Sequence, residues 1–486
     1  MNDSKNFRIE KDFLGEKKVP ADAYFGVQTM RAVENFPITG YKIDSALIKA
    51  LTMVKKAAAF ANSEIGQLDK KIANAIMTAA DEVIEGKLND QFIVDPIQGG
   101  AGTSINMNTN EVIANRALEI IGEQKGNYKA ISPNSHVNMA QSTNDSFPTA
   151  IHLSALMTLE KLIKVMEDLH SEFMKKANEF DGLIKMGRTH LQDAVPILLS
   201  QEFEAYARVL RRDIKRIKAT RNNLYEVNIG ATAVGTGLNA EPEYIKKAVD
   251  FLAKITGLPL KGSEDLVDGT QNTDCYIEVS AALKICMLNM SKVANDLRMM
   301  TSGPRCGLGE INLPPRQPGS SIMPGKVNPV MAEVLNQSAF QVAGNDLTIS
   351  MASEAGQFEL NVMEPVIAFN LLQSIKVMTN VFTVFRTHCL SGITANKERL
   401  EAYVNNSVGV ITAINPHVGY ETAASIAREA IISNRPVREI VLERGVLTNS
   451  ELDIILHPLE MTHPGIAGKE LLDKKLREKE NDLVLK

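Results

Sequence analysis

The chain has 486 residues, of which 44% are hydrophobic and 23% charged, a composition that excludes a wholly disordered, collagen-like or disulfide-scaffold protein. The 53 Lys and Arg residues stand against 58 Asp and Glu, and the formal charge of −5 gives no global electrostatic reason to expect nucleic-acid binding. The length exceeds what one hydrophobic core usually spans, so we expect several structural regions.

The N-terminal segment and the cysteines both indicate a cytoplasmic protein. The first eighteen residues alternate charges with isolated apolar side chains and contain no hydrophobic core of a signal peptide. The longest uncharged stretch, residues 402–420, is interrupted by Asn, Pro and His, so we expect no membrane helix there. The cysteines form no C-x-x-C pair, which argues against a zinc site or a disulfide framework. They are Cys275, Cys286, Cys306 and Cys389.

Helical periodicity dominates the chain. Residues 48–86 fit shorter helices, and apolar residues recur at three- and four-residue steps over 151–180 and again over 203–224. Residues 274–300 are apolar almost all round, as are 329–351 and 365–385, which is typical of helices buried among other helices. Clear β-hairpins are scarce. The sequence therefore predicts an all-α protein whose long helices form a bundle, and their apolar character favours an oligomer.

Three loops rich in hydroxyl, amide or cationic side chains each precede a proline and a predicted long helix. They are residues 141–145 before Pro148, residues 187–193 before Pro196, and residues 319–328 before Pro329. Proline suits the first turn of a helix, and a helix N-terminus binds anions through its free N–H groups. For any one loop, simple N-capping explains the side chains equally well. Together the loops supply more donors than capping requires, which favours a small-carboxylate site. These donors are Ser142, Thr143, Asn144, Thr189, His190, Lys326 and Asn328.

Other motifs fail on inspection. Residues 319–326 are not a phosphate-binding P-loop, because five residues separate the glycines and Val327 replaces the Ser or Thr that would hold magnesium. Residues 99–102 do not continue as G-x-G-x-x-G, so a dinucleotide fold is not indicated. The chain has no H-E-x-x-H motif.

The three loops together resemble the aspartase/fumarase superfamily of lyases. The superfamily signature Gly-Ser-Ser-x-Met-Pro-x-Lys-x-Asn is complete from Gly319 to Asn328. The similarity continues through residues 102–112, the Ser142 loop, residues 187–190 and residues 361–365, and it spans essentially the whole chain.

Within the superfamily, several positions resemble the aspartate ammonia-lyase branch more than class II fumarases. Residues 102–104 lack the Gln that fumarases usually carry after the Thr, and residues 142–144 read Ser-Thr-Asn in place of Ser-Ser-Asn. Residues 328–333 differ from the fumarase Asn-Pro-Thr-Gln-Cys-Glu. The resemblance therefore implies a carbon–nitrogen lyase that deaminates L-aspartate to fumarate and ammonia. A class II fumarase is the alternative, and a non-catalytic crystallin-like structural member is a further one.

The resemblance also implies an architecture. We expect an N-terminal, mainly helical region over 1–141, a central long-helix bundle over 142–396 and a small C-terminal helical region over 397–486. In the family, central helices from four subunits form one twenty-helix core, and each active site combines loops from three chains. The chain is accordingly expected to form a homotetramer that binds neither nucleic acid nor membranes.

By the same carry-over, Ser320 is the base that takes the Cβ proton as an alkoxide, through an aci-carboxylate intermediate. Thr189, Lys326 and Asn328 would hold the α-carboxylate. Four hydroxyls would hold the β-carboxylate, and Thr103, Asn144 and His190 would face the amino group. The four hydroxyls are those of Thr103, Ser142, Thr143 and Ser321. The Ala-Ser-Gly tripeptide of the ammonia-lyases that build their own electrophile is absent, so no built-in prosthetic group is expected. Neither an organic cofactor nor a catalytic metal is expected. Activation by a divalent cation at a separate site is left open.

Overall fold

The computed structural model describes residues 6–484. The chain divides into two compact units: Met1–Val165 with Asp213–Leu288 and Gln337–Asn380, and Met166–Arg212 with Asn289–Asn336 and Val381–Lys486. The predicted division into three regions follows the chain rather than these units, and it stays a prediction.

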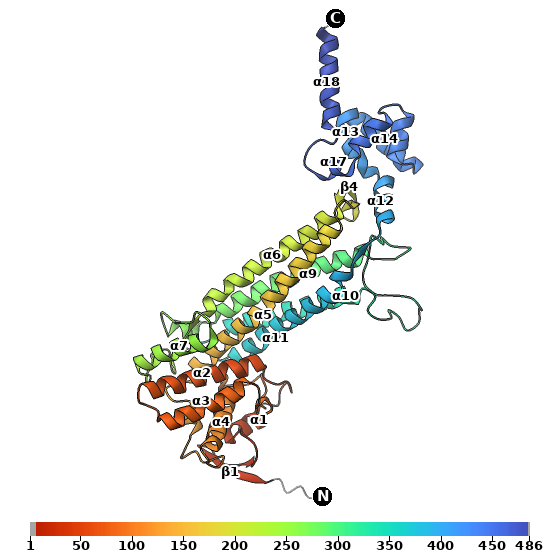
Figure 1. Cartoon of the computed structure of the whole chain (residues 1–486). Helices are drawn as coiled ribbons and strands as arrows, with labels where there is room; N and C mark the ends of the chain where they lie inside the picture. The colour runs from red at the N-terminus through yellow and green to blue at the C-terminus, as the bar shows by residue number, and fades with distance from the viewer. Residues whose placement is uncertain (1–5, 485–486) are drawn as a thin grey trace. The chain divides into compact units, whose positions relative to one another are not determined.

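Five helices of 25 residues or more stand out in the described part of the chain (Figure 1). Each contributes residues to both units. The periodicity predicted all five, so the all-α prediction is confirmed, and apolar side chains at helical spacing are the physical reason. The five helices are α5 (Thr143–Glu179), α6 (Leu199–Leu224), α9 (Asp274–Met300), α10 (Val330–Glu354) and α11 (Glu364–His388).

The first unit contains an antiparallel hairpin and five shorter helices. Strands β1 (Phe7–Asp12) and β2 (Gly15–Pro20) pair from Phe7 opposite Pro20 to Asp12 opposite Gly15. Helix α2 packs against α3 and α7, and α3 packs against α4. The carboxylates of Asp44 and Asp69 accept hydrogen bonds from the first turns of α2 and α3 and so define where these helices begin. The helices are α1 (Val27–Asn35), α2 (Ser45–Glu64), α3 (Lys70–Ile84), α4 (Thr103–Ile120) and α7 (Pro242–Thr256).

Polar contacts fix the neighbouring long helices of the first unit. Ser280 Oγ on α9 donates a 2.9 Å hydrogen bond to Asp346 Oδ1 on α10, and Lys284 forms an ion pair with the same carboxylate. Asn345 Nδ2 on α10 donates to Ser374 Oγ on α11 at 2.9 Å. These buried groups set the register of α9, α10 and α11, because an unpaired polar group inside a bundle would be costly.

The second unit holds a hairpin and the C-terminal helices. Strands β3 (Ile184–Thr189) and β4 (Gln192–Leu198) are antiparallel, and Ile184, Met186 and Leu198 join the same buried cluster as the apolar residues of the C-terminal helices. The hairpin is thereby anchored to the C-terminal part of the chain. Those helices are α12 (Lys397–Asn406), α13 (Ile411–Val418), α14 (Tyr420–Ser433), α15 (Val437–Glu443), α16 (Asn449–Ile455), α17 (Pro458–Thr462) and α18 (Lys469–Val484).

The remaining elements are short. Strand β5 pairs parallel to β6, and β7 pairs antiparallel to β8. They are β5 (Glu226–Val227), β6 (Lys261–Gly262), β7 (Ile311–Asn312), β8 (Thr394–Ala395), helix α8 (Asp268–Gln271), the 3-10 turns Asn89–Gln91, Leu390–Gly392 and Val408–Val410, and the π-helical turn Pro133–Val137.

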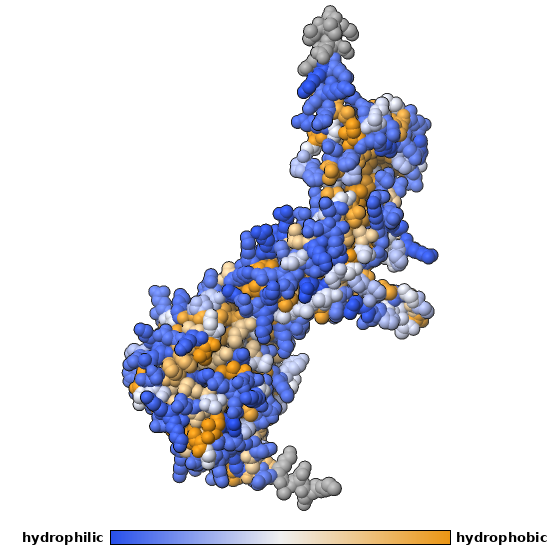
Figure 2. Space-filling model, viewed as in Figure 1, coloured by the Kyte–Doolittle hydropathy of each residue, from blue (hydrophilic) through white to orange (hydrophobic). Residues whose placement is uncertain are grey.

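One segment of the described chain, Glu364–Gly392, is long and apolar enough to cross a membrane by length and composition alone. Of its apolar window, 56% is buried within the protein, as expected for the core helix of a bundle. Apolar patches also reach the surface between hydrophilic stretches (Figure 2).

Candidate active site

The ten candidate residues fall into both units. The first unit carries Thr103, Ser142, Thr143 and Asn144, and the second carries Thr189, His190, Ser320, Ser321, Lys326 and Asn328.

Thr103 is the exposed first residue of α4. Gly102, with φ +91°, precedes it, and a Cβ at Gly102 would lie 2.5 Å from the ring of Phe147, so only glycine fits this helix start. The hydroxyl of Thr103 donates to the carbonyl oxygen of Gly100 at 2.7 Å. The Thr103 oxygen therefore has lone pairs left to accept a hydrogen bond, which suits an ammonium group better than a carboxylate.

Ser142 lies just before α5 and Thr143 is its first residue, and within the described residues neither hydroxyl proton has an acceptor. Ser142 Oγ accepts a hydrogen bond from the Asn144 N–H at 3.2 Å, and Thr143 Oγ1 accepts one from Asn106 Nδ2 at 3.1 Å. Because a hydroxyl has one proton and two lone pairs, both groups can still donate. Two free hydroxyl donors at a helix N-terminus are suited to bind an anion.

Asn144 offers a hydrogen-bond acceptor, whereas Ser142 and Thr143 offer donors. Its Nδ2 donates to the carbonyl oxygen of Ala233 at 2.7 Å, and its own backbone oxygen accepts from Asn228 Nδ2 at 3.0 Å. The side-chain oxygen remains as the acceptor, which is the sense required for contact with an ammonium group.

A buried carboxylate supports this loop from below. Asp145 is 1% exposed, and it accepts hydrogen bonds from the N–H groups of Ser142 and Thr232, each at 3.0 Å. Burial raises the pKa of Asp145 to about 7, against the lowering effect of these N–H donors and of the nearby cation Lys55.

Thr189 and His190 lie at the exposed tip of the β3–β4 hairpin. Thr189 pairs with Gln192, and the two residues between them, His190 and Leu191, both have positive φ, 54° and 59°. This is the backbone of a tight two-residue turn that normally requires Asn or Gly. The backbone strain at this tip is of the kind found at functional sites.

The structure corrects the expectation that each polar loop leads through a proline into the first turn of a helix. Pro329 does precede α10 directly, but Pro148 is the sixth residue of α5 and Pro196 lies in strand β4. Helix α6 begins only at Leu199, because the β3–β4 pairing continues through Leu198.

The Ser320 loop is closed at its base by two hydrogen bonds. The N–H of Gly319 donates to the carbonyl oxygen of Lys326 at 2.7 Å, and Asn328 Nδ2 donates to the carbonyl oxygen of Gly319 at 2.7 Å. A Cβ at Gly319 would lie 2.5 Å from the Lys326 oxygen, so this closure requires glycine. Asn328 thus has a structural contact in addition to its candidate role.

Within the loop, Ser320 Oγ accepts hydrogen bonds from the N–H groups of Ile322 at 3.2 Å and Met323 at 3.0 Å. Two backbone donors on one hydroxyl oxygen stabilise its deprotonated form. The arrangement can therefore support an alkoxide at Ser320.

A cavity of about 820 Å³ lies beside the base of this loop in the second unit. Lys326, Asn328, Arg298 and Glu333 are among the residues that line it. Within the described residues, the ammonium of Lys326 has no hydrogen-bond or ion-pair partner, and its side chain is exposed. A free cation at the rim of a cavity favours a negatively charged ligand.

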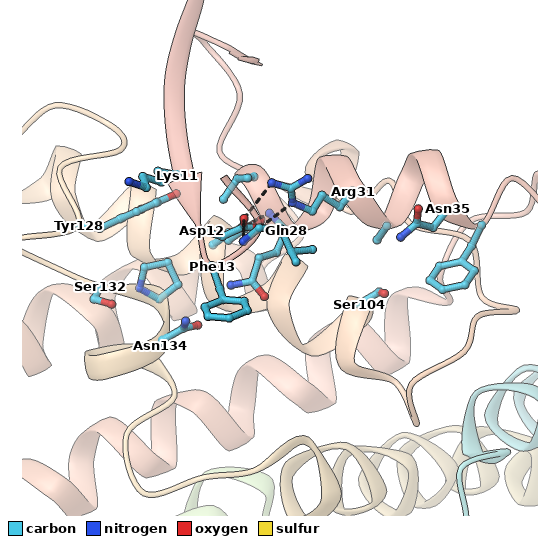
Figure 3. A pocket seen from close by; sticks show the side chains of 16 residues that line it. Lys11, Asp12, Phe13, Gln28, Arg31, Asn35, Ser104, Tyr128, Ser132 and Asn134 are labelled. Carbon is cyan, nitrogen blue, oxygen red and sulfur yellow. Dashed lines mark hydrogen bonds and ion pairs between the residues drawn. The ribbon is translucent and has the colours of Figure 1, made fainter. Parts of the chain in front are cut away.

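A second cavity, of about 560 Å³, lies in the first unit between β1, α1 and the π-helical turn (Figure 3). Arg31 forms a bidentate pair with Asp12 there, at 2.7 and 2.8 Å, and this pairing lowers the pKa of Asp12. None of the ten candidate residues lines this cavity. In the described part of the chain, no group of three His, Cys, Asp or Glu side chains is placed to hold a metal ion.

Comparison with known proteins gives consistent matches. A family model described as a lyase matches residues 15–344, and one described as the fumarase C C-terminus matches residues 410–463. An aspartate ammonia-lyase from Bacillus sp. is 70% identical over 463 residues, covering 95% of this chain and 99% of that protein. A fumarate lyase:delta crystallin from Brucella melitensis, solved bound to cobalt, is 48% identical with a TM-score of 0.92, covering 94% of this chain and 100% of that one. A class II fumarase from Schistosoma mansoni is 35% identical with a TM-score of 0.90 and the same coverage.

Proposed function

The chain belongs to the aspartase/fumarase superfamily and is a carbon–nitrogen lyase, and from this premise we propose that it converts L-aspartate reversibly into fumarate and ammonia. The observation that carries the proposal is the 70% identity to an aspartate ammonia-lyase over nearly the full length of both chains. The class II fumarase shares the fold but only 35% of the sequence, so fumarase activity is the less favoured candidate.

In the proposed reaction, Ser320 Oγ takes the proton from Cβ of the substrate. The electron pair of the broken C–H bond moves into the β-carboxylate and forms an aci-carboxylate. This pair then forms the double bond between Cα and Cβ, while the Cα–N bond breaks and its electrons leave with ammonia. The difficult step is the first one, because it adds negative charge to a group that is already charged.

The contacts of Ser320 support its role as the base. A serine hydroxyl is a weak base when free, and it needs a preorganised environment to act as an alkoxide. The N–H groups of Ile322 and Met323 point at its oxygen, and such donors in a fixed loop cost no reorganisation during the reaction.

The donor and acceptor pattern of the other loops supports the assignment of the substrate groups. Ser142 and Thr143 have hydroxyl protons free for the β-carboxylate, and Lys326 has a free ammonium for the α-carboxylate. Asn144 and Thr103 have acceptor atoms left for the amino group of L-aspartate. As the family resemblance implies, Thr189 and Asn328 also hold the α-carboxylate in this proposal. Ser321 holds the β-carboxylate, and His190 faces the amino group.

We propose further that the protein is a homotetramer in which three subunits contribute to each active site. Helix α10 supports an oligomer, because Phe340, Leu347 and Met351 are between 62% and 66% exposed and recur at steps of seven and four on one face. A monomer rarely leaves such a row of large apolar side chains in water.

The proposal also covers the cellular location of the protein and its need for a cofactor. We place the protein in the cytoplasm, a location consistent with its four free cysteines. The reaction as written needs no organic cofactor. Whether a divalent cation activates the enzyme is decided by adding magnesium to the assay below.

The direct test follows the ultraviolet absorbance of fumarate with purified protein given L-aspartate or L-malate, each with and without magnesium. Fumarate from L-aspartate alone is the expected result. Fumarate from L-malate alone would contradict the proposal and favour a fumarase. No fumarate from either would favour a non-catalytic, crystallin-like role.

The Ser320→Ala variant tests the assignment of the base. We expect kcat to fall by at least about 100-fold, since a lost general base costs roughly that much. Ser171→Ala is the matched control, because Ser171 is an exposed serine on α5 whose hydroxyl only bonds its own helix. A Ser320→Ala enzyme with near-normal turnover would remove Ser320 from the mechanism.

A further inference from the structure

A lysine without any exposed surface lies beneath the Ser142–Asn144 loop. Lys55 on α2 is 0% exposed, and its Nζ donates hydrogen bonds to Asn138 Oδ1 at 2.8 Å and Gln141 Oε1 at 2.9 Å. Both acceptors are neutral amides, and in the part of the chain that the structure describes no carboxylate contacts the ammonium directly. Burying a cation in this way is costly, and an apolar side chain would fill the space at lower cost.

The environment of Lys55 controls its charge. Burial lowers the pKa of Lys55 to about 7, and the nearby carboxylate of Asp145 acts in the opposite direction. Tyr244, fully buried on α7, is the other titratable side chain that interacts with Asp145, and burial keeps the pKa of Tyr244 well above its usual value. Tyr244 therefore stays neutral, and Asp145 is the nearby acidic group that favours the protonated form of Lys55.

From Lys55 a chain of hydrogen bonds leads to a candidate substrate contact. Asn138 Oδ1, which accepts from Lys55, also accepts from Asn106 Nδ2 at 3.3 Å and from Asn110 Nδ2 at 3.2 Å. Asn106 Nδ2 in turn donates to Thr143 Oγ1 at 3.1 Å. Each bond polarises the next, so the Lys55 Nζ donor at one end favours one orientation of the amides along the chain.

The consequence for Thr143 is the direction of its proton. Because Thr143 Oγ1 accepts from Asn106, the hydroxyl proton must point elsewhere. If Asn106 turned its amide around, its oxygen would take that proton and remove the donor. Lys55 opposes this turn, because it donates to Asn138 Oδ1, which in turn accepts from Asn106 Nδ2. Hydrogen bonds from Asn138 Nδ2 to the carbonyl oxygen of Gln141 at 3.1 Å and from Ser146 Oγ to Asn106 Oδ1 at 3.4 Å favour the same orientation of the two amides.

The Ser142 end of the loop is held by Asp145, independently of Asn106. Asp145 Oδ1 accepts from the Ser142 N–H, and its Oδ2 accepts from the Thr232 N–H. The buried pair of Lys55 and Asp145 therefore supports the two adjacent hydroxyls of the loop by separate routes.

We propose that Lys55 is a positioning residue for the lyase reaction, which acts through Asn138 and Asn106 to hold the Thr143 hydroxyl as a donor to the substrate β-carboxylate. The inference rests on the proposed function, since that function makes the β-carboxylate the group where charge builds up. Lys55 itself touches no substrate.

The principal test compares Lys55→Met with Lys56→Met. Lys56 is the adjacent lysine on α2, and its ammonium pairs with Asp81 on α3 instead of entering the chain. For Lys55→Met we expect kcat to fall about 10- to 100-fold and KM to change much less, because a misdirected donor is felt mainly in the transition state. Lys56→Met is expected to retain the wild-type kcat.

Two readouts separate positioning from general destabilisation. With L-aspartate deuterated at Cβ, the isotope effect on kcat should rise in Lys55→Met, because proton transfer becomes more rate-limiting. In a double-mutant cycle, Lys55→Met should add little to Thr143→Val, because both changes remove the same donor. A folded Lys55→Met protein with the wild-type kcat and isotope effect, or full additivity with Thr143→Val, would overturn the proposal.

A second pair of variants decides the question where Lys55→Met does not fold. Asn138→Leu interrupts the chain while Lys55 stays, and it should lower kcat as Lys55→Met does. Asn138→Asp retains an acceptor for Lys55 and Asn106, and it should restore most of the activity. Equal kcat values for these two variants would contradict the inference.

The same variants distinguish a failure of this inference from a failure of the proposed function. All ratios of variant to wild type are measured with whichever substrate the wild type turns over, L-aspartate or L-malate. Binding of succinate, an unreactive dicarboxylate, is followed by calorimetry in parallel. A loss of kcat in Lys55→Met but not in Lys56→Met, with similar succinate binding by both, would support the role of Lys55 even if L-aspartate were not the substrate, and an equal kcat in the two variants would refute it.

Discussion

Arg188 Nη1 lies 2.6 Å from Glu310 Oε1, and this contact ties the hairpin that carries Thr189 and His190 to the segment that leads into the Ser320 loop. Glu310 is 0% exposed, and Lys185 Nζ lies 3.4 Å from its other oxygen. The backbone of Glu310 is held as well, because its N–H donates to Met300 and its carbonyl oxygen accepts from Asn396. A single buried carboxylate thus connects two parts of the candidate site within the second unit.

Replacing Glu310 by Gln should destabilise the protein and lower its activity together. The substitution keeps the volume but leaves Arg188 without its charge partner, and breaking a buried ion pair from one side costs about 3–5 kcal/mol. We expect a comparable loss in urea unfolding and a lower kcat/KM. Glu202→Gln is the control, because Glu202 pairs with Lys185 at 2.9 Å but is 23% exposed, and its loss should cost less. An unchanged unfolding midpoint in Glu310→Gln would show that the contact contributes nothing.

A substitution at the tip of the β3–β4 hairpin should stabilise the protein. Leu191 is exposed and has φ +59°, a conformation that costs an L-residue about 1–2 kcal/mol. Leu191→Gly removes this cost and adds about 0.5–1 kcal/mol of backbone entropy loss, so a net gain of up to about 1.5 kcal/mol is expected. Thermal unfolding measures the change. Leu191→Ala keeps the Cβ and should gain nothing, and an equal gain in both variants would rule out backbone strain as the cause.

Helical periodicity and motif spacing predicted the long helices and the polar loops, but the hairpin between α5 and α6 was not predicted. The usual signal for a two-residue turn is Asn-Gly or Asp-Gly, and here the turn residues are His190 and Leu191. Pro196 also favours a helix start in sequence, whereas in the structure it lies in strand β4. The strand forms because Ile184, Met186 and Leu198 bury themselves against apolar residues more than 200 positions later, which no local pattern reveals.

The candidate site shows the same limit. Motif spacing singled out Ser142, Thr143 and Ser320, whose free protons and backbone donors fit their expected chemistry. Lys55 and Glu310 carry no motif and stand among ordinary helix and loop residues, so their importance becomes visible only through burial and long-range contacts. Sequence reveals the groups that face a ligand more readily than the groups that hold them in place.

Acid should weaken the C-terminal helices through Glu451. Its Oε1 lies 2.7 Å from Lys475 Nζ on α18, and its Oε2 accepts from the Thr448 N–H at 2.7 Å. These contacts, led by the hydrogen bond with Lys475, lower the pKa of Glu451 to about 2. Because the folded pKa is below the unfolded one, the stabilisation is complete above about pH 4.5 and is lost as the pH falls towards 2.

Urea unfolding of the wild type and of Glu451→Gln at pH 7, 4 and 3 measures this effect. We expect a difference of about 1–2 kcal/mol at pH 7, reduced for the partial exposure of the pair, and a smaller difference at each lower pH. Glu478→Gln is the control, since Glu478 is paired at 4.0 Å with a largely exposed Lys474. A difference that stays constant with pH would exclude ionisation of Glu451 as its source.

The exposed apolar row on α10 should decide the oligomeric state. Leu347 is 62% exposed in the single chain, between Phe340 and Met351 on the same helix face. In a tetramer built on these helices, Leu347→Asp would bury a charge against apolar neighbours, which costs several kcal/mol, so the variant should dissociate. Sedimentation velocity of the wild type and Leu347→Asp measures this directly.

Because each active site is proposed to need loops from three chains, the dissociated variant should also lose activity even though its own Ser320 loop is intact. The control is Glu354→Asp, a conservative change at the exposed end of the same helix, which should remain tetrameric and active. A Leu347→Asp monomer with full activity would refute the shared site, and a wild-type monomer would refute the tetramer.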